Sequence, residues 1–138
     1  MVFSYLLKHL KQKNVALLCT SGQLRSAAVK LMPFLMDSGA EIYYSGDTDP
    51  DGIRIADRLW KKYGDRIHVW RMSEEDYVKS LSEEEIGNVS IKKLETVENP
   101  VLRKTAKEVR KKKRAGYQEN ILKDLLEDME LERLSWKQ

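Results

Sequence analysis

Three aspartates lie at alternate positions in the segment "SGDTDPDG": Asp47, Asp49 and Asp51. Two carboxylates held within about 5 Å of each other repel unless one is protonated or a cation lies between them. A hard divalent cation, bound through carboxylate oxygens and water, is the usual solution. We therefore predict that Asp47 and Asp49 bind Mg²⁺ or Mn²⁺, and that Asp51 assists as a third ligand.

Helix capping offers a simpler explanation for two of these aspartates. Asp49 precedes Pro50, which is the pattern of an N-cap followed by proline at the first helical position. Asp51 then lies in the first turn, where the helix dipole favours a negative charge. Capping does not explain Asp47, which comes before the cap. A calcium-binding loop is a poor match, because the twelfth position of its pattern is Arg58 instead of glutamate.

The apolar pattern places the aspartates at the tip of a strand. Residues 15–20, 41–46 and 67–72 are short apolar runs typical of strands covered on both faces. Helical stripes over residues 24–36 and 53–63 separate them. Strands that alternate with such helices pair in parallel, so we expect an α/β fold with a parallel sheet flanked by helices. Ligands of such sheets bind at the carboxyl ends of the strands, where the aspartates fall.

The pattern changes after residue 72. Residues 73–87 predict short helical pieces, and residues 88–100 predict an irregular or briefly extended segment. A helix then begins at Pro100, and an amphipathic helix closes the sequence. We expect residues 73–138 to be a helical part that completes the same domain as the α/β core in residues 1–72.

The net charge of +3 is unevenly distributed. Residues 103–114 hold eight basic side chains and one acidic one, whereas residues 73–99 hold eight acidic and three basic ones. Like charges crowded on one helix destabilise it unless anions compensate them. DNA phosphates are one such compensation, and the neighbouring acidic segment is another. The residues that we expect to contact nucleic acid are Arg103, Lys104, Lys107, Arg110, Lys111, Lys112, Lys113 and Arg114.

Other chemistries find little support in the sequence. Thr20, Ser21 and Gly22 are candidates for a phosphate-binding loop, although a short strand-to-helix turn needs such residues in any case. Cys19 is the single cysteine, so it cannot form an internal disulfide. Neither histidine lies in a pattern typical of a general base. Catalysis would therefore rest on carboxylates and metal.

The composition, with 41% hydrophobic and 34% charged residues, is typical of a soluble globular protein. No segment approaches the roughly 20 apolar residues that a membrane helix needs. The first apolar stretch is followed by lysines and has no cleavage site of the signal-peptide type. We expect a cytoplasmic protein with no membrane partner.

The segment "GDTDPDGIRIA" resembles the second acidic motif of the Toprim fold, which topoisomerases, bacterial primases and several nucleases share. Over most of the chain, "LLCTSGQLRSAAVKLMPFLMDSGAEIYYSGDTDPDGIRIADRL", "VWRMSEEDYVKSL" and "GYQENILKDLL" resemble the Toprim-like C-terminal domain of bacterial proteins related to the nuclease subunit of the Wadjet plasmid-defence system. The resemblance implies a Toprim-like sheet, Asp47 and Asp49 as Mg²⁺ ligands, and cleavage of DNA. It also implies a second copy, or proteins of a DNA-maintenance or defence complex, as partners.

The chain departs from this family at its start. Family members carry a catalytic glutamate on a preceding strand, and "MVFSYLL" resembles the helix that follows it. We expect a C-terminal fragment that begins just after this glutamate and is inactive by itself. Glu119 in "GYQEN" resembles a second acidic position of some relatives, and a plain helix-start glutamate is the alternative. Glu98 in "VENP" is a further candidate.

Two function classes stay open. The first is a Mg²⁺-dependent nuclease-like domain, in which Asp47, Asp49 and Glu119 are catalytic. The second is a non-catalytic Toprim-like scaffold that binds nucleic acid or protein. A weaker third, a receiver-like domain, would need a lysine at a later strand end, where Arg71 is the nearest basic residue.

Overall fold

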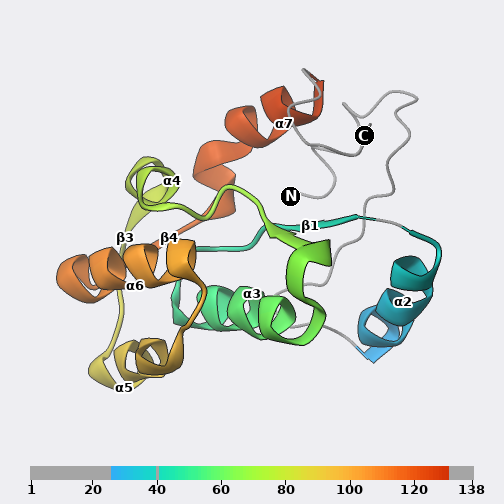
Figure 1. Cartoon of the computed structure of the whole chain (residues 1–138). Helices are drawn as coiled ribbons and strands as arrows, with labels where there is room; N and C mark the ends of the chain where they lie inside the picture. The colour runs from blue at the N-terminus through green and yellow to red at the C-terminus, as the bar shows by residue number, and fades with distance from the viewer. Residues whose placement is uncertain (1–25, 40, 131–138) are drawn as a thin grey trace.

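A small parallel sheet lies at the centre of the computed structural model, which describes residues 26–39 and 41–130 (Figure 1). Strand β1 (Ile42–Tyr44) pairs in parallel with β2 (Ile67–Val69), with Ile42 opposite Ile67. The Trp70 N–H extends the pairing by donating to the Tyr44 carbonyl at 2.8 Å. The predicted α/β class and the parallel pairing of these two strands are confirmed. The strand expected over residues 15–20 lies outside the described residues.

Helix α3 (Pro50–Tyr63) connects the two strands. Asp49 is its N-cap, as predicted, and its Oδ1 accepts a hydrogen bond from the Gly52 N–H at 2.7 Å. The helix ends before Gly64, whose φ of +63° is a conformation that glycine adopts without strain. Helix α2 (Ser26–Asp37) ends close to Gly39, where φ is +87°.

Helix α3 contributes to two apolar clusters. Ile53 and Ala56 pack in the larger one, to which α6 (Pro100–Lys112) gives three buried residues and α4 (Glu74–Ser80) gives one. Ile55 and Leu59 pack in the smaller one with Met32 of α2 and Ile67 of β2. Because apolar side chains leave α3 on two sides, this helix joins the sheet to the C-terminal half.

Residues 73–87 are not all helical, which corrects one expectation. Helix α4 ends at Ser80, and strand β3 (Leu81–Glu85) pairs antiparallel with β4 (Arg114–Gly116). The three successive glutamates of this segment favour a helix locally, but pairing with a strand about thirty residues later overrides that preference.

Residues 88–100 are mostly helical, which corrects a second expectation. Helix α5 (Asn88–Lys92) runs into the 3₁₀-helix η2 (Lys93–Thr96). Leu94 and Val97 are buried and Ile91 is partly buried, all packed in the larger cluster. The apolar residues recur every third position, which is the spacing at which 3₁₀ side chains eclipse one another.

Helix α6 begins at Pro100, as predicted, and its N-cap Asn99 accepts hydrogen bonds from the N–H groups of Val101 and Leu102. The buried carboxylate of Asp57 on α3 holds this start by accepting from the Asn99 N–H at 2.8 Å. The helix ends at Lys112, and Lys113 takes a left-handed conformation with φ of +54°. The basic run is therefore divided between a helix and a strand.

The C-terminal part follows β4 directly. The 3₁₀-helix η3 (Gln118–Ile121) leads into α7 (Leu122–Glu130), whose buried side chains include Leu125 and Met129. The predicted amphipathic helix is confirmed. In Figure 1, α7 lies on the opposite side of β1 from α3.

Candidate carboxylate site

Asp47 lies just beyond the carboxyl end of β1, and a segment far along the chain fixes its position. Its Oδ1 accepts a hydrogen bond from the Gln118 N–H at 2.9 Å. The adjacent Thr48 and Gly116 exchange two backbone hydrogen bonds, with N···O distances of 2.7 and 3.2 Å. The strand tip predicted from sequence is therefore attached to β4 and η3.

A tight turn connects Asp47 to α3. A Cβ added at Gly52 would collide with the backbone carbonyl oxygen of Asp47, so only glycine fits there. The Gly52 N–H instead donates to the capping carboxylate of Asp49. The predicted cap at Asp49 is confirmed, and the loop places Asp47 near enough to Asp49 for its charge to raise the pKa of Asp49.

The electrostatics of the loop reflect crowded negative charge. Burial raises the pKa of Asp47 above its usual value, and the neighbouring negative charge of Glu119 adds to the rise, while the Gln118 hydrogen bond opposes it. Burial also raises the pKa of Asp49, with contributions from Asp47 and Asp51. Among the residues that the structure describes, no Lys or Arg forms an ion pair with Asp47 or Asp49. This pair of carboxylates is suited to a cation.

Glu119 is brought to the same place, although 72 positions separate it from Asp47. It lies in the first turn of η3, next to the Gln118 amide that binds Asp47. Glu119 is an exposed residue. The predicted grouping of Asp47, Asp49 and Glu119 in one neighbourhood is therefore consistent with the fold.

The other two acidic candidates, Asp51 and Glu98, approach lysine side chains. Asp51 is about two-thirds exposed, with 66% of its side chain accessible, and pairs with Lys93 at 3.2 Å. Glu98 approaches Lys61 at 3.6 Å. Lys61 follows Asp49 by twelve residues, roughly 18 Å along a helix, so Glu98 is not part of the site.

The described residues contain no group of three His, Cys, Asp or Glu side chains arranged to hold a metal ion. A cation bound by Asp47 and Asp49 would therefore have few protein ligands. Mg²⁺ commonly binds in this way, through one or two carboxylates, with waters and substrate phosphates completing its coordination.

Three residues next to the carboxylates, in space or in sequence, were missed by sequence reasoning. Burial, together with the charges of Asp47 and Asp49, raises the pKa of the Tyr44 hydroxyl to about 12, so this phenol stays protonated beside the carboxylates. The Ser45 hydroxyl is buried and has no hydrogen-bond partner among the described residues. Lys93 borders the site through Asp51. Tyr44 and Ser45 end the apolar run before the aspartates, which is the one sequence signal that could have identified them.

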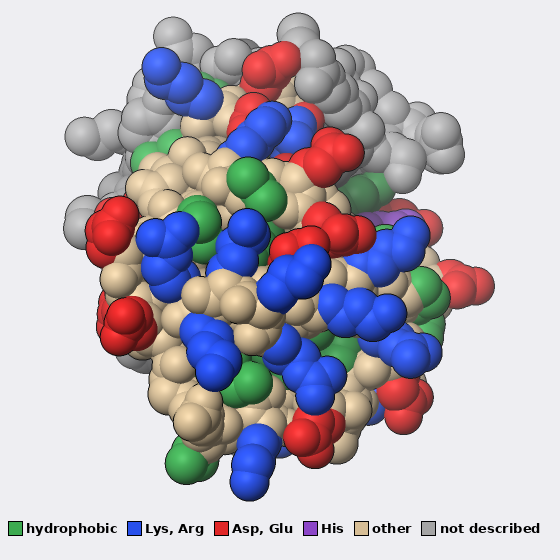
Figure 2. All heavy atoms as spheres, turned by 90° about the vertical axis from the view of Figure 1, so that its left-hand side faces the viewer, with side chains coloured by type: hydrophobic (Ala, Val, Ile, Leu, Met, Phe, Trp, Pro, Cys, Tyr) green, Lys and Arg blue, Asp and Glu red, His purple; other side chains and the backbone are tan. Residues whose placement is uncertain are grey.

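The predicted nucleic-acid-binding residues form a basic face. Helix α6 buries Leu102, Thr105, Ala106 and Val109 and exposes its lysines and arginines on the other side. Figure 2 shows Lys and Arg side chains gathered on the side of the molecule where α5 and α6 lie in Figure 1. Acidic neighbours approach two of them, since Arg110 and Arg114 lie 3.9 Å from Glu95 and Glu83. Both of the compensations expected from sequence thus stay open.

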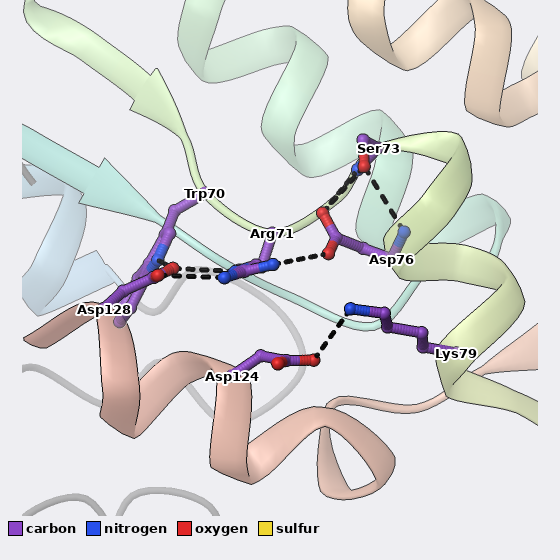
Figure 3. Close-up of polar contacts among 7 residues, drawn as sticks. All are labelled: Trp70, Arg71, Ser73, Asp76, Lys79, Asp124 and Asp128. Atoms are coloured by element: carbon purple, nitrogen blue, oxygen red, sulfur yellow. Dashed lines mark hydrogen bonds and ion pairs between the residues drawn. The ribbon is translucent and has the colours of Figure 1, made fainter. Parts of the chain in front are cut away.

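Among the described residues, Arg71 forms no hydrogen bond or ion pair with Asp47. Its guanidinium binds Asp128 of α7 and Asp76 of α4 (Figure 3). The receiver-like hypothesis therefore gains nothing from it. The phosphate-loop candidates Thr20, Ser21 and Gly22 lie outside the described residues.

A model of the family described as "Protein of unknown function C-terminus (DUF2399)" matches residues 1–129. No curated protein and no solved structure matches the chain. Within the described part of the chain, none of the helices has both the length and the apolar character that crossing a membrane requires.

Proposed function

We propose a function for this chain, which belongs to the DUF2399 family: it is a Toprim-type, Mg²⁺- or Mn²⁺-dependent DNA-processing domain. In the complete protein this domain would form the C-terminal part of a nuclease-like protein that cleaves phosphodiester bonds. DNA is the expected partner, together with a second copy or the proteins of a DNA-maintenance or defence complex. The expected location is the cytoplasm.

One observation carries the proposal: carboxylates from two distant segments gather at the carboxyl end of a parallel strand. Asp47 and Asp49 follow β1, and Glu119 follows β4. Burial and the neighbouring negative charges make the ionised forms of Asp47 and Asp49 unfavourable. A divalent cation is the ligand that would relieve this cost, and the carboxyl end of a parallel strand is where α/β sheets bind ligands.

Each carboxylate has a role in this proposal. Asp47 and Asp49 would hold the cation, which would offset the charge of a phosphate undergoing cleavage. Asp51 would keep Lys93 beside the site instead of binding the metal directly, because the two already form an ion pair. Glu119 would orient or deprotonate a water molecule next to Asp47.

The basic face would hold the DNA backbone. Arg114 lies two residues before Gly116, which pairs with Thr48 beside Asp47. A strand rises about 3.3 Å per residue, so the end of the basic run lies roughly 7 Å from this junction. A duplex whose phosphates contact this end of the basic run would therefore lie close to the carboxylates.

A nicking assay with the complete protein tests the proposal. With Mn²⁺, the wild-type protein should convert supercoiled plasmid to the open circle, and Asp47→Asn should lower the rate at least a hundredfold while leaving the circular dichroism spectrum unchanged. Glu98→Gln is the matched control, because it removes an equal charge from an exposed side chain outside the site. Equal nicking by Asp47→Asn and the wild type would refute the assignment.

A non-catalytic binding module is the second candidate. It is favoured by the local hydrogen bonds of the carboxylates, since backbone amides of Gln118 and Gly52 already donate to Asp47 and Asp49. In this case the basic face would bind a polyanion without metal. Electron paramagnetic resonance of Mn²⁺ added to the 138-residue chain distinguishes the two, because only the first candidate requires bound Mn²⁺.

A further inference from the structure

We propose that Arg71 is a positioning residue: it fixes η3 against the Asp47 loop and so holds Glu119 beside Asp47. Its importance for cleavage rests on the function proposed above, whereas its geometric role does not. Arg71 follows β2 at the same sheet edge as the carboxylates, because β1 and β2 run parallel.

Arg71, at the end of β2, contacts both α4, which follows it closely in sequence, and α7, where its partner Asp128 lies 57 positions later (Figure 3). Its Nε and Nη2 donate to the two carboxylate oxygens of Asp128 on α7, at 2.7 and 2.9 Å. Its Nη1 donates to Asp76 on α4 at 3.2 Å. The Trp70 indole N–H donates to the same Asp128 at 2.9 Å. A bidentate arginine–carboxylate pair of this kind restricts direction as well as distance.

The two carboxylates that Arg71 contacts are buried, so each needs a hydrogen-bond donor or a cation. Asp128 and Asp76 are only 5% and 6% exposed. Because the Arg71 guanidinium meets this need for both carboxylates, its position restrains α4 and α7 together. Asp76 is occupied further by the capping box of α4, in which the Ser73 hydroxyl and N–H donate to its Oδ2.

The backbone at Arg71 is unusual and serves this arrangement. Its φ of +54° is a left-handed conformation, which non-glycine residues seldom adopt. Such strain persists only where surrounding contacts impose it, and it is concentrated at functional sites. Here it accompanies a side chain that points at α4 and α7 together (Figure 3).

Both helices held by Arg71 in turn hold η3. Helix α7 continues directly from η3 at Leu122. At the end of α4, the Ser80 carbonyl accepts hydrogen bonds from the Tyr117 backbone N–H at 3.0 Å and from the Asn120 side-chain amide at 2.9 Å. In sequence, Glu119 lies between Tyr117 and Asn120, the two residues that bind the Ser80 carbonyl. The position of η3, including the Gln118 amide that binds Asp47, therefore depends on how α4 and α7 are held together.

Hydrogen exchange measured by NMR tests this inference on the full chain. Arg71→Lys keeps the charge but loses the bidentate geometry. Exchange of the Gln118 amide, which donates to the Asp47 carboxylate, is compared with that of the Ile53 amide, which lies in the first turn of α3 and donates to the Asp49 backbone carbonyl. Relative to wild type, we expect Gln118 exchange to accelerate about tenfold more than Ile53 exchange. A differential below threefold would overturn the proposal, since it would indicate a role in overall stability alone.

Two further variants keep the test decisive. Asp128→Asn removes the carboxylate that Arg71 binds through two oxygens, and it is used under the same threefold criterion if Arg71→Lys does not fold. Lys79→Met removes a different contact between α4 and α7, an exposed ion pair with Asp124 at 3.7 Å. In this variant, Gln118 exchange should accelerate less than threefold more than Ile53 exchange. A differential equal to that of Arg71→Lys would contradict a specific role for Arg71. Because the measurement uses no metal or DNA, it can succeed even where the nicking assay fails.

Discussion

Thr48 and Gly116 exchange two backbone hydrogen bonds across 68 positions of sequence, and the Thr48 hydroxyl also donates to the Gly116 carbonyl at 3.2 Å. This junction brings the loop after β1 to the end of β4. The Ser80 hydroxyl lies 3.2 Å from that of Thr48, so α4 reaches the same point. The carboxylates of both segments therefore depend on one closely packed contact.

Gly116→Ala should disrupt this junction. An added Cβ would collide with the hydroxyl oxygens of Thr48 and Ser80, and overpacking of this kind costs about 1–3 kcal/mol. Urea unfolding followed by circular dichroism measures the loss. Gly87→Ala is the control, because Gly87 has a φ of −71° and no atom within 4 Å of the added Cβ. Equal stability of the two variants would show that the junction tolerates expansion.

Two substitutions of Asp49 separate its capping role from its proposed metal role. Asp49→Ala removes the hydrogen bond from the Gly52 N–H, so it should cost about 1 kcal/mol, or roughly 4 °C in Tm. Asp49→Asn retains a capping acceptor and removes a charge whose burial raises the pKa of Asp49, so it should be at least as stable as the wild type at pH 7. Both variants should lose the rise in Tm that Mn²⁺ gives to the wild type, since a cation that binds only the native state stabilises it. A full Mn²⁺ response in Asp49→Asn would contradict its assignment as a ligand.

The pH dependence of stability should reveal the repulsion at Asp47. Its pKa in the folded state is raised above the ordinary value of 3.8, so the native state binds the proton more tightly than the unfolded state does. Stability is therefore lost as the pH rises through the folded pKa. Asp47→Asn keeps an acceptor for the Gln118 N–H but carries no charge. The variant should be more stable than wild type at pH 7 and nearly equal to it below pH 3.8, as measured by thermal unfolding without divalent cations.

Local signals made the α/β elements predictable. The Asp49-Pro50 cap and the apolar stripe ending before Gly64 define α3 from sequence alone, and β1 and β2 follow from short apolar runs. Capping chemistry and side-chain periodicity act within a few residues, so they can be read without knowledge of the fold.

The remainder depended on contacts between distant segments. Strand β3 forms because "LSEEE" pairs with β4, although its glutamates favour a helix. The position of Glu119 beside Asp47 follows from the Thr48–Gly116 pairing, which no local pattern indicates. For the same reason the ion pair between Asp51 and Lys93 was not predictable from sequence, and the assignment of Asp51 as a metal ligand stays a prediction.

The basic face makes a quantitative prediction for DNA binding. Lys104 and Lys107 are exposed on α6, and each phosphate contact contributes about 0.9 to the slope of log affinity against log salt concentration. Replacing both with glutamine should reduce this slope by about 2 for a B-form duplex, measured by fluorescence anisotropy between 50 and 200 mM salt. The matched control replaces Lys79 on α4 and Lys123 on α7, which changes the net charge equally. If the control lowers the slope as much, the attraction comes from net charge alone and α6 is not the binding surface.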